Sequence, residues 1–275
     1  MNTNTKTFLA AGLAAALPFF LLAPGRAGEK RRPFLGRNFA HRGLHTEDGS
    51  VPENSLAAFR RAVESGYGME LDVQLSRDGA VVVFHDDTLE RVCGVPGRVD
   101  SYDLAQLRAL RLGETEERIP LFSEVLSLVA GRQPLIVELK TGPHNAELCA
   151  KTCALLHAYD GPVCIESFDP RIVTWFRFHA PEFFRGQLAQ LPEEYEKSGM
   201  SRAKAFVLGH TLLNAAARPE FIAYRIGPRP ASVRLAETLG AVPVGWTSHD
   251  PSSEEGRGAV IFEFYEPKPR YLWMV

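Results

Sequence analysis

The chain has 275 residues, of which 45% are hydrophobic and 23% are charged, and its formal net charge is -2 at pH 7. This length suits one α/β barrel or two small domains, and the composition is ordinary for a protein with a large core. A net charge near zero excludes bulk binding to nucleic acid, which relies on a strongly basic surface.

The N-terminal stretch differs from the rest of the chain. Residues 8–23 form an uninterrupted apolar run, FLAAGLAAALPFFLLA, which basic residues flank on both sides. The run is a little short for a membrane span, which needs about 20 residues, and it also fits the core of a signal peptide. We therefore expect residues 1–24 to anchor the protein in a membrane or to direct its export before cleavage. The side of the membrane and the oligomeric state stay open.

The remaining chain divides into a short linker and one domain. Residues 25–37 are basic and contain Pro and Gly, which predicts a linker, and residues 38–275 are expected to form a single domain. The four cysteines show no CxxC spacing, and a chain of this length needs no disulfide staples. We expect Cys93, Cys149, Cys153 and Cys164 to be free thiols.

The domain opens with a strand and an amphipathic helix. The first strand is predicted over 38–42. Residues 54–65 space their apolar side chains three and four apart and stop before Gly66, which is typical of a helix with a glycine stop. A second strand covers 67–75.

A hairpin is predicted next. The Asp78-Gly79 pair indicates a tight turn into an antiparallel strand over 80–85. Because such a strand folds back along its neighbour, His85 should return to the acidic residues of strand 67–75.

Strands and helices continue to alternate along the rest of the chain. Further helices are predicted at 103–111, 121–129 and 145–158. Further strands are predicted at 135–139, 163–168, 184–189, 221–226, 242–247 and 259–264. Regular alternation over this length predicts a (β/α)8 barrel of the TIM type. Nine strand candidates are one too many for such a barrel, so 80–85 is expected to be an extra hairpin strand.

Three carboxylates occupy positions that suit a metal site. Glu70 and Asp72 are two residues apart in one strand, so both side chains project to the same side, and Glu138 ends another strand. Adjacent carboxylates repel each other unless a cation neutralises them, although salt bridges to surface Arg or Lys are the alternative. An all-oxygen set favours Mg²⁺ or Ca²⁺, with Mn²⁺ also suitable, over Zn²⁺. We predict one divalent metal ion.

Two histidines supply groups for acid–base chemistry. His41 and His85 each end an apolar strand, and cleavage of a phosphodiester requires both a base and an acid that titrate near neutral pH. Arg42 and Lys140 are candidates to offset charge on the phosphate oxygens. His45 follows His41 by four residues, which leaves a zinc pair as an alternative, although no helix is expected there.

Other residues have weaker assignments. Asn54 fits the N-cap of the helix that follows, and Glu53 either orients Arg42 or serves the same cap. Glu166 ends a strand and could support the site indirectly. Trp246 either lines the pocket or fills the barrel core.

These residues occur in an ordered set of motifs that is similar to a known family. The motifs are His-Arg-Gly at 41–43, Pro-Glu-Asn at 52–54, Glu-Leu-Asp-Val at 70–73, Asp-Gly at 78–79, His-Asp at 85–86, Ile-Pro-Leu-Phe at 119–122, Glu-Leu-Lys at 138–140 and Glu-Ser-Phe at 166–168. The set resembles the glycerophosphodiester phosphodiesterase family. The resemblance implies a (β/α)8 barrel that hydrolyses glycerophosphodiesters to glycerol 3-phosphate and an alcohol. It also implies that segment 87–120 is a small insertion beside the substrate entrance.

The resemblance implies the same residue roles. The acid–base pair falls on His41 and His85. The metal ligands fall on Glu70, Asp72 and Glu138. Arg42 and Lys140 fall on positions that face the phosphate.

The C-terminal third departs from the family pattern. Residues 246–249 read Trp-Thr-Ser-His where the family has Trp-Thr-Val-Asn, and Phe262-Glu263-Phe264 replaces a Thr-Asp pair. These positions are expected to line the alcohol side of the site, so they affect the choice of substrate more than the reaction. Two alternatives stay open: a lysophospholipase D-like enzyme that acts on membrane lysolipids, which the apolar N-terminus favours, and a catalytically silent barrel that serves as a binding module.

Overall fold

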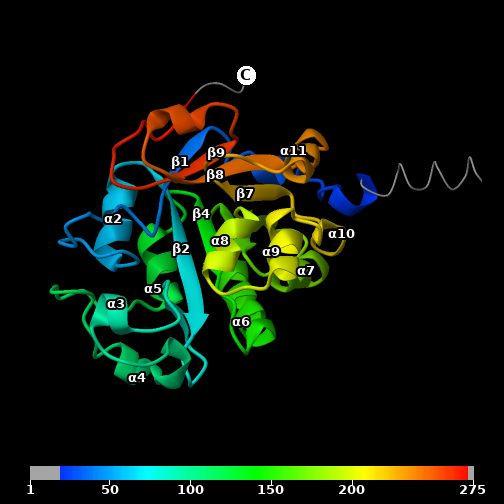
Figure 1. Cartoon of the computed structure of the whole chain (residues 1–275). Coiled ribbons are helices and arrows are strands. Elements are labelled where there is room, and N and C mark those ends of the chain that lie inside the picture. The colour runs from blue at the N-terminus through cyan, green and yellow to red at the C-terminus, as the bar shows by residue number, and fades with distance from the viewer. Residues whose placement is uncertain (1–18, 272–275) are drawn as a thin grey trace, which may run out of the picture.

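A closed barrel of parallel strands forms the centre of the molecule (Figure 1). The computed structural model describes residues 19–271. The strands of this part of the chain are β1 (Arg37–Ala40), β2 (Gly68–Leu75), β3 (Val81–Val83), β4 (Leu135–Leu139), β5 (Val163–Ser167), β6 (Phe184–Ala189), β7 (Phe221–Arg225), β8 (Val242–Ser248) and β9 (Ala259–Phe262). The barrel order is β1-β2-β4-β5-β6-β7-β8-β9, and β9 pairs with β1 to close it. The predicted TIM-type barrel is confirmed.

Helices surround the barrel and fill the connections between its strands. They are α2 (Leu56–Glu64), α3 (Glu90–Cys93), α4 (Leu104–Leu107), α5 (Phe122–Val129), α6 (Asn145–His157), α7 (Pro170–His179), α8 (Pro192–Lys197), α9 (Arg202–Gly209), α10 (Asn214–Ala217) and α11 (Ala231–Thr238). Short 3-10 turns are η1 (Gly28–Arg31), η2 (Val99–Ser101) and η3 (Pro251–Glu254). Strands β4 and β6 are buried along their whole length, as expected for a parallel sheet that is covered on both faces.

The extra strand is β3, which pairs antiparallel with the far end of β2. Strand β2 is long enough to serve two partners along one edge: Gly68 and Met69 lie beside β1, whereas Val73 to Leu75 lie beside β3. The backbone amide of Phe84 donates to the carbonyl of Asp72 at 3.0 Å, so the hairpin brings the next residue, His85, to the acidic part of β2.

The insertion below the hairpin has less helix than we predicted. The helix expected over 103–111 covers only α4, because its backbone tightens into turns after Arg108 and Arg111 pairs with Arg118 in an isolated bridge. The side chains of Leu107 and Leu112 pack with Phe84 in a small separate hydrophobic core. The insertion therefore packs on the outer face of β3 and supports the hairpin.

The segment expected to be a basic linker packs against the barrel. Phe34 is 4% exposed, and its ring lies 6.2 Å from that of Phe39 and 5.4 Å from that of Phe184 at the amino ends of the strands. Ala27 is also buried in this cluster. Residues 27–35 thus close the floor of the barrel, at the end opposite to the carboxyl ends of the strands.

The predicted anchor or signal segment, residues 1–24, lies largely outside the described residues, which begin at Phe19. Within residues 19–271, no helix has the length and apolar character that a bilayer crossing requires. The four cysteines all lie in this range and are free thiols, as predicted.

Candidate active site

Neighbouring strands place the three predicted carboxylates together. Asp72 on β2 lies in register with Glu138 on β4, and Glu70 precedes Asp72 by two residues on the same face. Carboxylate oxygens of the three residues lie within 4.8 Å of one another, and all three side chains are buried. Glu166, in register with Glu138 on β5, extends this row and is also buried.

The buried carboxylates repel one another. Burial and the charges of Asp72 and Glu138 raise the pKa of Glu70 well above its usual value. Burial and the charge of Glu138 do the same to the pKa of Glu166. The arrangement therefore carries a surplus of negative charge that an added cation would relieve.

Two cations offset part of this charge. The Lys140 ammonium lies 2.8 Å from Glu138 Oε1 and 3.3 Å from Asp72 Oδ1. Burial alone would raise the pKa of Asp72, but the charges of Lys140 and Arg42, together with other partners, lower it well below its usual value. The Arg42 backbone amide donates to Glu70 Oε2 at 3.0 Å.

The donor set fits a divalent cation. Glu166 Oε2 is buried without a hydrogen-bond partner, and Asp72 Oδ1, also buried, has only the ion pair with Lys140 at 3.3 Å. Glu70, Asp72 and Glu138 offer only oxygen, which suits Mg²⁺, Ca²⁺ or Mn²⁺ rather than Zn²⁺. The three residues are thus able to hold one such ion.

A sharp turn after β1 sets the position of His41 and Arg42. Arg42 has a left-handed backbone with φ of 52°, and Gly43 follows with φ of 77°. A Cβ atom at Gly43 would lie 2.9 Å from the Ala58 Cβ, so the close approach of helix α2 requires glycine there. The turn directs the Arg42 side chain towards Glu53, and the guanidinium donates a hydrogen bond to Glu53 Oε1 at 2.8 Å.

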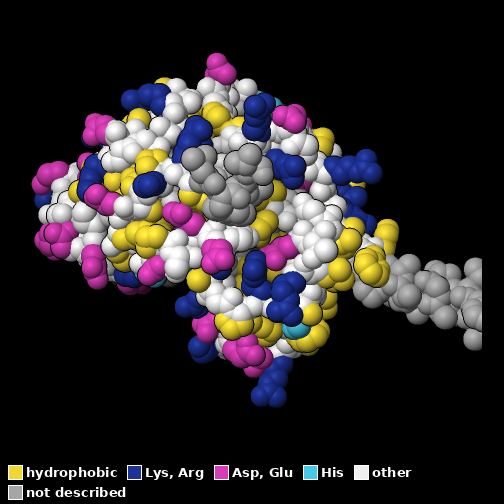
Figure 2. All heavy atoms as spheres, turned by 90° about the horizontal axis from the view of Figure 1, so that it is seen from above, with side chains coloured by type: hydrophobic (Ala, Val, Ile, Leu, Met, Phe, Trp, Pro, Cys, Tyr) yellow, Lys and Arg dark blue, Asp and Glu magenta, His cyan; other side chains and the backbone are white. Residues whose placement is uncertain are grey.

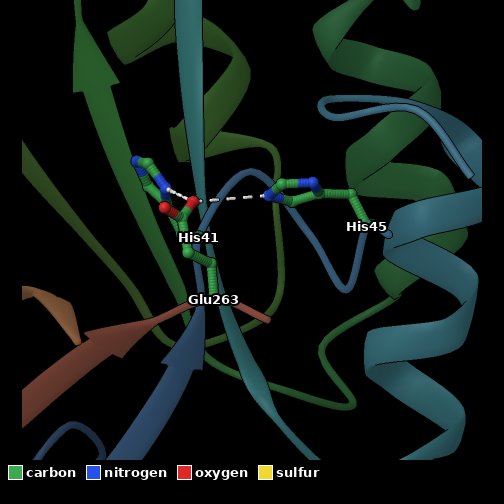
Figure 3. A group of neighbouring side chains, drawn as sticks. All are labelled: His41, His45 and Glu263. Carbon is green, nitrogen blue, oxygen red and sulfur yellow. Dashed lines mark hydrogen bonds and ion pairs between the residues drawn. The ribbon is translucent and has the colours of Figure 1, made fainter. Parts of the chain in front are cut away.

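The pairing of β1 with β9, which closes the barrel, orients His41 (Figure 3). Ala40 on β1 pairs with Phe262 on β9, so the next residues, His41 and Glu263, face each other directly after the paired strands. Glu263 Oε2 lies 2.7 Å from His41 Nδ1 and 3.6 Å from His45 Nε2, and Figure 3 shows the carboxylate between the two rings. A carboxylate accepts only, so Nδ1 of His41 holds the proton and Nε2 stays free to accept one.

Burial controls the protonation of His41. Desolvation lowers the pKa of His41, and the hydrogen bond to Glu263 only partly opposes this effect. The pKa of Glu263 is itself well below its usual value, because the hydrogen bond from His41 and the nearby His45 outweigh burial. A neutral His41 beside an ionised Glu263 therefore persists at neutral pH.

A network of acidic and basic side chains holds His85. Nδ1 of His85 lies 2.6 Å from Asp86 Oδ1. Arg91 donates to both oxygens of Asp86, at 2.6 and 2.9 Å, and to both oxygens of Glu53, at 2.8 and 2.7 Å. Glu53 also accepts a hydrogen bond from Arg42. One chain of contacts therefore connects Arg91 of the insertion to Arg42 and to Asp86, the partner of His85.

Trp246 lies at the carboxyl end of β8. Its indole N–H donates to the Ala223 carbonyl at 3.0 Å, and its ring meets Phe168 edge-on at 5.5 Å. The side chain is half-buried. It therefore packs against the barrel core near the carboxyl ends of the strands.

Several contacts were not predicted from the sequence. Asn54 is not the N-cap of α2: Ser55 caps the helix, and Asn54 donates to Asp72 Oδ2 at 2.9 Å. Glu263, expected beside the alcohol, hydrogen-bonds His41 instead. His249 also lies 3.7 Å from Glu263. A carboxylate directly after the last strand was the available signal for the Glu263 contact.

Comparisons with known proteins identify the family. The fold is a (β/α)8 barrel in which a buried group of three carboxylates, able to hold a cation, lies near His41 and His85. Residues 41–261 match the glycerophosphoryl diester phosphodiesterase family, and the chain belongs to this family.

The names of several relatives refer to a glycerophosphodiester phosphodiesterase or to a lysophospholipase D. A glycerophosphodiester phosphodiesterase of Caldanaerobacter subterraneus is 42% identical over 111 residues, which are 38% of this chain and 44% of that protein. Bacillus subtilis YhdW is 33% identical over 189 residues, 64% of this chain and 76% of that protein. Human lysophospholipase D GDPD1 is 32% identical over 144 residues, 48% of this chain and 44% of that protein. The chain therefore spans less than half the length of two of these relatives.

The fold has solved counterparts. A phosphodiesterase from Oleispira antarctica, solved in complex with the product sn-glycerol 3-phosphate, superposes with a TM-score of 0.69 and 25% identity over 84% of this chain and 94% of that one. A glycerophosphodiester phosphodiesterase from Thermotoga maritima gives 0.62 and 25% over 82% and 93%.

Proposed function

We propose that the protein hydrolyses glycerophosphodiesters to glycerol 3-phosphate and an alcohol, with one divalent metal ion at Glu70, Asp72 and Glu138. The convergence of this carboxylate group with His41 and His85 at one end of the barrel carries the proposal. The names of the family and of its relatives support it, because they refer to phosphodiester cleavage. When bound, the ion would supply positive charge to the non-bridging phosphate oxygens.

The two histidines would move the protons. His41 is neutral, and its Nε2 is free, which is the form that a general base requires. His85 would then give a proton to the departing alkoxide, with Asp86 holding the ring. Arg42 and Lys140 would bind the phosphate oxygens, and Trp246 would contact the alcohol side. Glu53 and Glu166 would position Arg42 and Glu138.

The apolar N-terminus supports a proposal on where the protein is located. Residues 1–24 would anchor the protein in a membrane or direct its export. Such a position would bring the site to lipid-derived diesters.

Release of glycerol 3-phosphate from glycerophosphocholine by the full chain tests the function. Chelation should abolish release, and addition of Mg²⁺, Ca²⁺ or Mn²⁺ should restore it. His41→Ala or His85→Ala should lower kcat by at least about 100-fold, the usual contribution of acid–base catalysis. His179→Ala, an exposed histidine on α7, is the matched control. Activity that chelation and His41→Ala leave unchanged would refute the mechanism, and inactivity on all phosphodiesters would favour a silent barrel.

A further inference from the structure

Two histidines and a carboxylate gather where the first and last strands of the barrel meet. His41 directly follows β1, Glu263 directly follows β9, and His45 lies in the loop after His41. One ligand atom from each residue lies within 4.8 Å of the other two, and Figure 3 shows the carboxylate between the two rings. We call this group the His41–His45–Glu263 cluster.

The loop after β1 brings the two histidines together without a helix. The left-handed backbone of Arg42 and Gly43 reverses the chain, and the His45 amide then donates to the Gly43 carbonyl at 2.9 Å. The Phe264 ring meets the His45 ring edge-on at 5.0 Å and holds it in place. The spacing of four residues therefore yields two neighbouring imidazoles, although the segment is not helical.

The unpaired nitrogen of His45 points to a ligand. The His45 side chain is only 8% exposed, and its Nε2 is buried without a hydrogen-bond partner. Oε2 of Glu263 lies 3.6 Å from this nitrogen, which is beyond hydrogen-bond distance. A buried polar atom without a partner costs free energy. A cation between Nε2 and the carboxylate would supply the missing partner.

The distances suit a small ion with nitrogen ligands. Zn²⁺ binds imidazole and carboxylate at about 2.0–2.2 Å in a tetrahedron, so neighbouring ligand atoms are about 3.3 Å apart. The His45–Glu263 distance of 3.6 Å is close to this value, and the His41–Glu263 distance of 2.7 Å would lengthen by about 0.6 Å. His41 and Glu263 are 16% and 18% exposed, which leaves an approach for the ion and room for a water ligand.

The donor set differs from that of the three carboxylates. Two imidazole nitrogens and one carboxylate suit Zn²⁺, whereas Glu70, Asp72 and Glu138 offer only oxygen, which suits Mg²⁺ or Ca²⁺. Figure 2 shows acidic and basic side chains interspersed over the face that is seen from above, so the charge of this face would not favour one cation over another. Selection between the two kinds of ion therefore depends on the ligand atoms.

We propose that the His41–His45–Glu263 cluster binds Zn²⁺ and that the bound ion inhibits catalysis. The inhibition rests on the proposed function, in which Nε2 of His41 accepts a proton. In the metal-free cluster, Nδ1 of His41 carries the ring proton and donates it to Glu263. Zn²⁺ takes the lone pair of Nδ1, the proton moves to Nε2, and the ring stays neutral. Nε2 then donates instead of accepting, so His41 no longer serves as the base.

Cobalt provides a direct test of binding. Co²⁺ accepts the same ligands as Zn²⁺ and absorbs visible light, so its spectrum reports nitrogen ligands and a low coordination number. The full chain, with its three carboxylates saturated by Mg²⁺, should bind a single equivalent of Co²⁺ with intense d–d bands. Addition of Zn²⁺ should remove these bands.

His45→Ala removes one ligand but no group of the proposed mechanism. It should weaken the binding of Co²⁺ and Zn²⁺ at least about 100-fold, since even the loss of a contact to a metal ligand costs about 10- to 100-fold. His157→Ala is the matched control and should keep the bands. The His157 ring also contacts a carboxylate, that of Glu182 at 2.7 Å, and lies 3.6 Å from Cys153 Sγ. His45→Gln, whose amide is a poor zinc ligand, repeats the test if His45→Ala fails to fold.

Hydrolysis of glycerophosphocholine tests the inhibition. With saturating Mg²⁺, buffered free Zn²⁺ should lower the kcat of the parent and of His157→Ala at least about 100-fold, as the loss of a general base does. Additional Mg²⁺ should not relieve this inhibition. His45→Ala should need at least about 100-fold more Zn²⁺ for the same fractional loss.

The outcomes separate the claims. Co²⁺ bands that persist in His45→Ala, or that disappear in His157→Ala, would overturn the site. Inhibition that Mg²⁺ relieves and that His45→Ala does not weaken would place Zn²⁺ at the three carboxylates, which would also overturn it. Bands that depend on His45 without zinc inhibition would overturn the effect on catalysis. Inactivity on every phosphodiester would refute the proposed function, and the Co²⁺ bands would still decide the site.

Discussion

The hydrogen bond between His41 and Glu263 joins residues that are 222 positions apart in the sequence. Its effect is local: it fixes one tautomer of the imidazole and directs Nε2 towards the site. Burial and the Glu263 contact act on His41 in opposite directions, so the state of this one side chain depends on both.

Glu263→Gln should separate these two effects. The hydrogen bond and charge of Glu263 raise the pKa of His41 against burial, so their loss should lower that pKa further. The acidic limb of the kcat/KM profile, which reports deprotonation of His41, should move to lower pH. The maximum should fall at least about ten-fold, because the orienting carboxylate is gone.

Steady-state rates between pH 4 and 9, roughly the range over which histidine titrates, provide the measurement. His249→Gln serves as the control, since this exposed ring lies 3.7 Å from Glu263 and does not contact His41 directly. A limb that moves to higher pH in Glu263→Gln would contradict the prediction.

Lys140 balances the buried carboxylates when no metal is bound. Its removal leaves Glu138 and Asp72 without their nearest ammonium, at a position where the Lys140 side chain is only 14% exposed. Lys140→Met should lower the free energy of unfolding of the metal-free protein by about 3 kcal/mol.

Urea denaturation in the presence of a chelator measures this loss, and excess Mg²⁺ or Ca²⁺ should recover part of it. Lys197→Met removes an ammonium that is 71% exposed and pairs with Glu194 at 2.7 Å. Solvent screening should limit its effect to about 0.5 kcal/mol. Equal losses in the two variants would mean that Lys140 does not compensate the carboxylates.

The β2–β3 hairpin is the element that places His85. Its turn has Gly79 with φ of +79°, a conformation that β-branched residues avoid. Gly79→Val should cost about 2 kcal/mol of stability and also lower kcat, because the strained turn would shift β3, which ends two residues before His85.

Gly66→Val offers a matched comparison. Gly66 has the same φ of +79°, but it precedes the amino end of β2, away from the rim. Both variants should unfold at similarly lower urea concentration, whereas only Gly79→Val should lose activity under native conditions. A kcat loss of the same size in Gly66→Val would show that strain alone, and not the position of His85, is responsible.

Local signals account for what could be predicted from the sequence. The strand over Leu135–Leu139 is so apolar that it was predicted with its observed bounds. The Asp78-Gly79 pair predicted the hairpin. The contact between Glu263 and His41 was missed, because it depends on the pairing of the first and last strands of the closed barrel and not on a local pattern. Asn54 was assigned to the helix cap by a local rule. Such a rule gives no information on a partner that is distant in the sequence, and here the partner is the buried carboxylate of Asp72.

At the scale of the whole molecule, the floor of the barrel depends on residues before the first strand. Phe34 fills the amino end of the barrel beside Phe39 and Phe184. Phe34→Ala should lower the free energy of unfolding by about 3 kcal/mol or more, the usual cost of removing a buried aromatic ring.

Thermal or urea unfolding measures the change in Phe34→Ala. Arg32→Ala, whose side chain is 86% exposed two residues earlier, should change stability by less than about 0.5 kcal/mol. A Phe34→Ala protein as stable as the parent would show that residues 27–35 contribute little to the barrel.

The closure of β9 on β1 also sets a time at which activity can begin. His41 is made early in synthesis and Glu263 late, so a nascent chain that still lacks β9 has both histidines and the three carboxylates of the candidate metal site but no partner for His41 Nδ1. The candidate site is therefore complete only once the last strand of the barrel has been synthesised. A ribosome-bound chain stalled before Glu263 would lack the carboxylate that orients His41.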